Sequence, residues 1–108
     1  MAITINIYYT GAEGNARKFA AEMISRGIAD EIRREEGNLR YDYFIPMDDE
    51  TSILLIDSWE DQAALDRHHR TPMMAQIAEL REKYGLRMRV ERYVPDALPH
   101  ANRQFIRK

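Results

Sequence analysis

The sequence predicts an α+β domain in which helices cover one face of a four-stranded antiparallel sheet. Four segments alternate apolar and polar residues with the period of two that is typical of strands. Helical spacing fills the gap between the first and second strands and the gap between the third and fourth, while a short polar link joins the second strand to the third. This order is that of the ferredoxin-like arrangement.

Composition indicates a small single domain. The chain has 108 residues, of which 44% are hydrophobic, enough for a small core. A net charge of −2 with charges of both signs argues against nucleic-acid binding, which needs a clustered basic face. No apolar run reaches the ~18 residues of a membrane span, and no signal-peptide pattern opens the chain, so we expect a cytoplasmic protein without a membrane partner. The absence of cysteine excludes disulfides and thiol catalysis.

The first strand is expected over residues 3–10, and one helix is expected from Asn15 to about Glu36. Gly37 is a natural stop for that helix, because glycine adopts the left-handed conformation without steric cost. The charged residues just before Gly37 indicate a solvated last turn. The apolar stripe of this helix consists of Ala16, Phe19, Ala20, Met23, Ile24, Gly27, Ile28 and Ile32.

A hairpin is expected next, with strands over residues 39–45 and 53–59. The acidic connection between them lacks the spacing of a calcium loop. If the turn is centred near Asp49, Tyr41 lies opposite Asp57 and Leu39 lies opposite Trp59.

A broken helix follows the hairpin. Asp61 is suited to cap a helix over residues 62–70, and Thr71-Pro72 is a specific signal for the start of a second helix, with threonine as the cap. That second helix ends at Gly85, and its apolar stripe consists of Met73, Ile77, Leu80 and Tyr84.

The fourth strand is expected over residues 86–94, so that residues 1–94 form the domain and residues 95–108 form a C-terminal tail. Several strands carry apolar or aromatic groups on both faces. We therefore expect a second copy of the chain to cover the helix-free face of the sheet, giving a homodimer, and we expect the tail to pack on the partner subunit.

Two adjacent histidines are candidates for chemistry. His68 and His69 point about 100° apart on a helix, so they cannot hold one metal as an i, i+4 pair would. His68 shares a face with Leu65 and should point toward the sheet, while His69 should face solvent. His68 is then either a half-buried structural residue or a general acid/base.

Trp59 and Asp57 share one face of the third strand. Trp59 is a core residue, a flat wall for a planar ligand, or both. Burying Asp57 unpaired would be costly. We favour a place at the wet end of the strand, paired with an arginine such as Arg40, over a polar spot inside a pocket. The sequence has no phosphate loop, nucleophile elbow or dinucleotide fingerprint, so no cofactor or metal is predicted.

Three short segments resemble the antibiotic biosynthesis monooxygenase (ABM) domain family, which includes the small quinol monooxygenases. Their order and spacing carry the resemblance, which extends over about residues 3 to 94. The segments are Arg34 to Asp42 (REEGNLRYD), Asp57-Ser58-Trp59, and Ala64-Leu65 with His68 and Thr71-Pro72.

The resemblance implies a ferredoxin-like homodimer, a dimeric α/β barrel with a pocket between sheet and helices in each subunit. It implies a cofactor-independent monooxygenase that oxidises a quinol or related small aromatic with molecular oxygen, without metal or organic cofactor. By resemblance His68 is the catalytic base, and Trp59 and Asp57 are pocket groups that bind substrate. Tyr41, opposite Asp57, and Leu65, on the helix face of His68, are expected to bind substrate with them. The family more usually has glutamate where Asp57 stands.

Two other activities fit the resemblance less well. A relative that isomerises a phosphorylated autoinducer-2, a small sugar-like dione, shares the Glu-Glu-Gly-Asn-Leu-Arg segment, but it carries a histidine where this chain has Met73. Haem-degrading relatives use an asparagine, a tryptophan and a histidine, and Ile7, His68 and Ala78 stand at those positions. A non-catalytic dimer that binds a small apolar ligand is the alternative from a different functional class.

Overall fold

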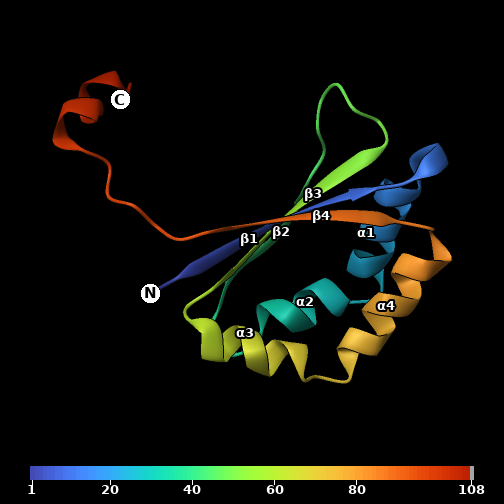
Figure 1. The fold of residues 1–108 in the computed structure, drawn as a ribbon. Helices are drawn as coiled ribbons and strands as arrows, with labels where there is room; N and C mark the ends of the chain where they lie inside the picture. Colours follow the sequence, from blue (N-terminus) through green and yellow to red (C-terminus); the bar gives the residue numbers. More distant parts are fainter. Residues whose placement is uncertain (108) are drawn as a thin grey trace.

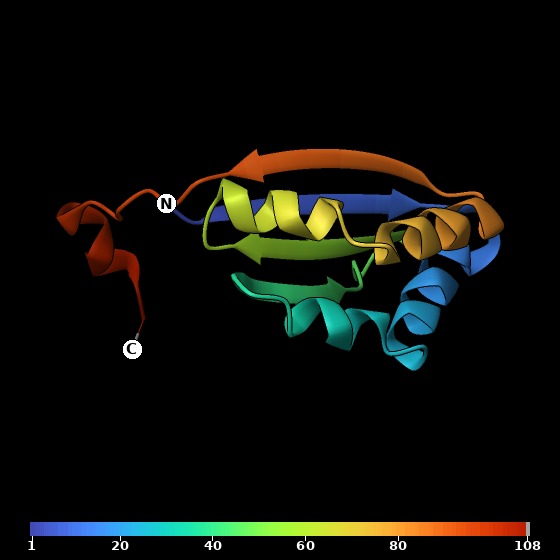
Figure 2. The same cartoon turned by 90° about the horizontal axis from the view of Figure 1, so that it is seen from below.

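The computed structural model describes residues 1–107 and has the predicted ferredoxin-like fold (Figures 1 and 2). The strands are β1 (Ile3–Thr10), β2 (Asn38–Phe44), β3 (Ser52–Trp59) and β4 (Arg87–Tyr93), and they form one antiparallel sheet in the order β2-β3-β1-β4. The helices are α1 (Asn15–Ser25), α2 (Ile28–Arg33), α3 (Gln62–His69) and α4 (Met73–Lys83), with 3₁₀ turns η1 (Ala12–Gly14) and η2 (His100–Phe105). None of the helices within residues 1–107 is both long and apolar enough to cross a membrane.

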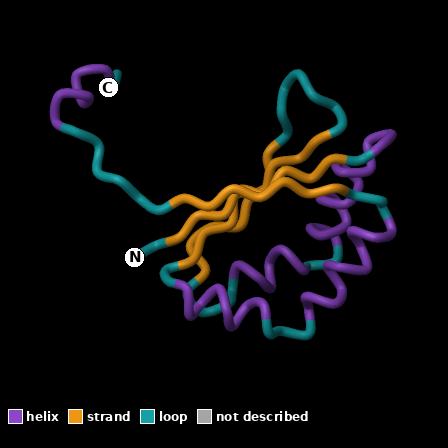
Figure 3. Tube along the Cα trace, in the orientation of Figure 1, coloured by secondary structure: helices purple, strands orange, loops and turns teal. Residues whose placement is uncertain are grey.

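The core lies between the sheet and the helices α1 to α4, which all cover the same face (Figure 3). Alternation along the strands places one set of side chains in this core. From β1 and β3 these include Ile3, Tyr9, Ile53, Leu55 and Trp59, all buried. The apolar stripes of the helices complete it, except that Ile24, which was expected on the stripe of the first helix, is exposed.

The single helix expected before Gly37 is in fact two helices. Gly27 separates α1 from α2 with a φ of 77°, a left-handed conformation that ends one helix and redirects the chain. Gly37 has a φ of 85°, but it lies in the turn into β2, after α2 has already ended.

The hairpin register is confirmed at one position and wrong at the other. Tyr41 pairs with Asp57 as predicted. A bulge after Asn38 shifts the register, so Asn38 pairs with Trp59 and Leu39 is 57% exposed. One inserted residue is enough to interrupt the inward and outward alternation of side chains along a strand. The apolar pattern of this segment does not indicate the bulge.

Two caps were predicted in the α3–α4 region. Asp61 does cap α3, since its carboxylate accepts a hydrogen bond from the Ala64 amide at 2.9 Å. Thr71 does not cap α4. Its hydroxyl instead donates to the His68 carbonyl at 2.8 Å and so closes the end of α3, and Pro72 directly precedes α4.

The opposite face of the sheet is not covered by any helix within residues 1–107 (Figures 1 and 3). Residues 94–107 leave the end of β4 and extend away from the domain (Figures 1 and 2). Both features bear on assembly.

Candidate active site

An apolar pocket lies between the sheet and the helices α3 and α4. Side chains of all four strands form its floor, and the two helices form its roof. The residues that line it are Ile5, Ile7, Tyr9, Tyr41, Leu55, Asp57, Gln62, Leu65, His68, His69, Met74, Ile77, Arg81, Met88, Val90 and Arg92. Aliphatic side chains with a few convergent polar groups are typical of a small-molecule site.

His68 lines this pocket and is bonded to Glu35. Its side chain is buried and its Nδ1 lies 2.7 Å from the Glu35 Oε2. A carboxylate can only accept, so Nδ1 carries the proton and Nε2 keeps its lone pair. His68 is buried and His69 is exposed, as predicted, although His69 also contributes to the lining of the pocket.

Burial also changes the pKa of His68. Desolvation lowers the pKa of this imidazole below its ordinary 6.5, while the hydrogen bond and charge of Glu35 act in the opposite direction. The net direction is downward, so the ring is neutral at pH 7. A neutral ring with a fixed tautomer can accept a proton at Nε2.

Trp59 supports the His68 ring from behind. The two rings stack with centroids 4.8 Å apart and planes 27° apart. Trp59 is fully buried and its indole N–H donates to Asp57 Oδ1 at 2.8 Å. It does not line the pocket. Trp59 is therefore a core residue that contacts two pocket groups, the His68 ring and the Asp57 carboxyl.

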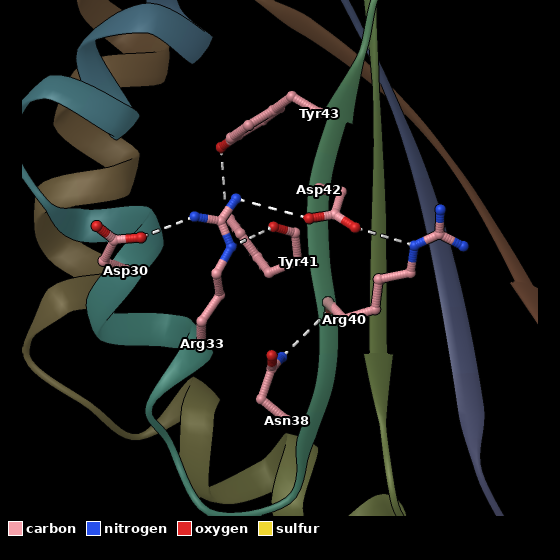
Figure 4. Close-up of polar contacts among 7 residues, drawn as sticks. All are labelled: Asp30, Arg33, Asn38, Arg40, Tyr41, Asp42 and Tyr43. Atoms are coloured by element: carbon pink, nitrogen blue, oxygen red, sulfur yellow. Dashed lines mark hydrogen bonds and ion pairs between the residues drawn. The ribbon is translucent and has the colours of Figure 1, made fainter.

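Asp57 lies inside the pocket with 5% of its surface exposed. Burial raises its pKa to about 7, the Trp59 hydrogen bond opposes that rise, and the Glu35 charge adds to it. The favoured expectation of an ion pair with Arg40 is wrong. Arg40 lies opposite Ser58 and bonds to Asp42 at 3.1 Å (Figure 4).

Tyr41 and Leu65 both line the pocket. The backbone of Tyr41 is anchored to α2, because Arg33 Nε donates to the Tyr41 carbonyl at 2.9 Å (Figure 4). Its hydroxyl lies 3.3 Å from that of Tyr43. Burial raises the pKa of Tyr41 well above its ordinary 10, so it stays a neutral phenol.

Sequence reasoning missed Glu35, which the charged run before Gly37 made appear solvated. It is 33 residues from His68 in the chain, and only the turn after α2 brings it to the imidazole. It also missed Arg81 and Arg92, two arginines that line the pocket. No group of three His, Asp or Glu side chains within the described part of the chain is arranged to hold a metal ion.

Comparisons with known proteins agree on fold and family. The family described as antibiotic biosynthesis monooxygenase matches residues 2–80. YcnE of Bacillus subtilis (strain 168), named a putative monooxygenase, is 28% identical over 69 residues, which cover 64% of this chain and 70% of YcnE.

Two solved structures illustrate the shared fold. PA3566 from Pseudomonas aeruginosa has a TM-score of 0.75 at 26% identity, covering 89% of this chain and 95% of that one. SnoaB from Streptomyces nogalater, described as a cofactor-independent oxygenase, has a TM-score of 0.70 at 17% identity, covering 90% and 95%.

Proposed function

Because the chain belongs to the antibiotic biosynthesis monooxygenase family, we propose that it is a cofactor-independent monooxygenase that oxidises a quinol or a related small aromatic with molecular oxygen. The observation that supports this most directly is the Glu35–His68 pair at the edge of an apolar pocket. It fixes one imidazole tautomer and leaves Nε2 available to a substrate hydroxyl. The cofactor-independent activity in the description of SnoaB agrees with the proposal.

The chemistry begins with a proton transfer. His68 Nε2 removes the hydroxyl proton, and the resulting phenolate is electron-rich enough to give an electron to oxygen. The substrate radical and superoxide combine into a carbon-bound hydroperoxide. This hydroperoxide carries the proton that His68 had removed. The carbon that bears it then loses its hydrogen as a proton, the C–H electron pair forms the new C=O bond, and the O–O bond breaks to release hydroxide, which takes up a proton to become water. The substrate supplies both hydrogens of that water and all the electrons, so it is itself the reductant.

Asp57 has the properties needed for the second half of this reaction. With a pKa of about 7 it is partly protonated at neutral pH, so it can supply the proton that O–O cleavage needs. His68 and Asp57 are linked through Trp59, which stacks on one and donates to the other. The proposed base and the proposed acid thus both contact the same indole ring.

The test is oxygen uptake with a panel of reduced quinols and polycyclic phenols, using protein checked to be free of metal and flavin. We expect uptake above the spontaneous rate that is abolished in His68→Ala and retained in Arg67→Ala, a change at an exposed position of the same helix that does not line the pocket. Folding of both variants is checked by circular dichroism. Binding of the panel without any uptake would instead indicate a non-catalytic binding protein.

We also propose that the active form is a homodimer. Tyr8, Leu54, Ile56 and Phe44 form a patch of large apolar side chains on the helix-free face of the sheet, and Tyr8 and Phe44 both pair with Leu54. The Asn6 Oδ1 on the same face is buried and has no hydrogen-bond partner within residues 1–107. A second copy would cover the patch and could satisfy this oxygen.

The tail belongs to the same proposal. Leu98, Phe105 and Ile106 are exposed, and packing on the partner subunit would bury them. Deleting residues 95–108 should then weaken the dimer in sedimentation or light scattering. A full-length protein that is monomeric at micromolar concentration would refute the dimer, and an unchanged dimer affinity after deletion would refute the role of the tail.

A further inference from the structure

The pocket has two chemically different ends. The sheet register places Asp57, Ile5 and Arg92 in one row across β3, β1 and β4, and this row is at the His68 end. Tyr9 and Met88 form another row, four residues further along β1. With a rise of about 3.3 Å per residue, the two rows are about 13 Å apart.

Between the two ends the pocket is apolar. Ile7 pairs with Leu55 on one side and Val90 on the other, and all three line the pocket. Leu65 and Met74 lie above them on the helices. A flat hydrocarbon surface fits this middle region, because none of these side chains offers a polar partner.

The far end holds a cation. Arg81 on α4 is half-buried, and its Nη1 donates to the sulfur of Met88 at 3.0 Å. Arg81 and Tyr9 both line the pocket, and the charge and hydrogen bonding of the guanidinium act on the Tyr9 hydroxyl. Burial raises the pKa of Tyr9 to about 12, and the guanidinium opposes that rise.

Arg81 has no acidic counterpart among the residues that the structure describes. No carboxylate in residues 1–107 lies within 4 Å of its guanidinium. Lys83, two positions later on the same helix, is paired with Glu22 at 2.9 Å. A half-buried charge beside an apolar surface is costly without a partner, and a thioether is a weak one. A ligand anion would satisfy it.

We propose that Arg81 and the Tyr9 hydroxyl form a subsite for an anionic group at the end of the substrate remote from His68. The ligand class is a fused-ring hydroxyaromatic with a carboxylate at the opposite end from its reacting hydroxyl. This rests on the proposed function only in assigning the hydroxyl to His68. A phosphate would offer the same charge, but the apolar middle of the pocket favours an aromatic carboxylate.

Three commercial ligands separate these features in binding calorimetry. 6-Hydroxy-2-naphthoate carries its carboxylate at the opposite end from the hydroxyl, 3-hydroxy-2-naphthoate carries it next to the hydroxyl, and 2-naphthol has none. We expect the 6-hydroxy acid to bind most tightly. Equal binding of all three, or a preference for the 3-hydroxy isomer, which would place the anion near Arg92, overturns the proposal without requiring any variant.

Variants then assign the preference to one side chain. Arg81→Gln should weaken binding of the 6-hydroxy acid by about 10- to 100-fold, the loss expected for a charge-assisted hydrogen-bonded pair, and leave 2-naphthol unaffected. Arg81→Lys should retain the carboxylate preference. Arg70→Gln is the control, since Arg70 is exposed at the end of α3 and does not line the pocket. An unchanged preference in Arg81→Gln overturns the proposal.

Two further measurements distinguish an aromatic carboxylate from a small phosphate, and the anion subsite from the monooxygenase proposal. Arg81-dependent binding of ribulose 5-phosphate, with none of the naphthoates, would overturn the aromatic class in favour of a small phosphate. Binding is measured without turnover, so the expected ligand order together with an absence of oxygen uptake would refute the monooxygenase proposal and leave the anion subsite standing.

Discussion

Replacing Asp57 with asparagine should stabilise the protein at alkaline pH. Asp57 is buried and its folded-state pKa is raised, so the protonated form is the one the fold favours. A group with a raised folded pKa contributes its stability fully below its unfolded pKa and loses it as the pH rises through the folded value. Asparagine keeps a side-chain oxygen for the Trp59 indole N–H and never ionises.

The size of this stabilisation follows from the pKa shift of Asp57. The pKa moves from 3.8 to about 7, and each unit is worth about 1.4 kcal/mol. At pH 8 the buried group is ionised, so Asp57 costs up to about 4 kcal/mol relative to a neutral side chain. At pH 4 the folded group is protonated and the unfolded group is about half ionised, so the cost is below about 1 kcal/mol.

Urea unfolding of wild type and Asp57→Asn at pH 4 and pH 8 tests this. We expect the stabilisation by asparagine to be clear at pH 8 and nearly absent at pH 4. Asp48→Asn, in the exposed β2–β3 connection, is the control and should leave the free energy of unfolding unchanged at both pH values. Equal stability differences at the two pH values would refute the assignment of a raised pKa to Asp57.

Two more predictions concern the turn between α2 and β2. Glu35→Gln should lower the rate of oxygen uptake by about 10- to 100-fold and move the acid limb of the pH–rate profile to lower pH, because Glu35 raises the pKa of His68. Glu36→Gln should do neither, and an unmoved limb in the Glu35 variant would contradict the pairing. Gly37→Ala should cost about 2 kcal/mol or more of stability, because its φ is 85° and its Cβ would lie 2.5 Å from that of Ala64. An unchanged urea midpoint would show that the turn relaxes.

The parts of the fold that depend on periodicity could be predicted from the sequence. Alternation identified all four strands, and the position of the hairpin turn was enough to pair Tyr41 with Asp57. The inward direction of His68 followed from its spacing to Leu65 on one helix. These inferences need only local geometry, which the chain repeats every two residues or every turn.

The parts that failed depend on single residues or on long-range contacts. Gly27 reads as one position of an apolar stripe, yet its left-handed φ divides the helix. The bulge after Asn38 leaves no mark in the apolar pattern. Glu35 meets His68 only after α2 and α3 have packed on the same face of the sheet, so no spacing rule could assign its role.

The stacking of Trp59 on His68 gives this protein a built-in optical probe. Trp59 is the only tryptophan of the chain, so all indole emission arises beside the proposed base. An imidazolium ring accepts an electron from excited indole far more readily than a neutral imidazole does. The emission intensity should therefore decrease as His68 becomes protonated at falling pH. It reports the protonation state of one side chain without any label.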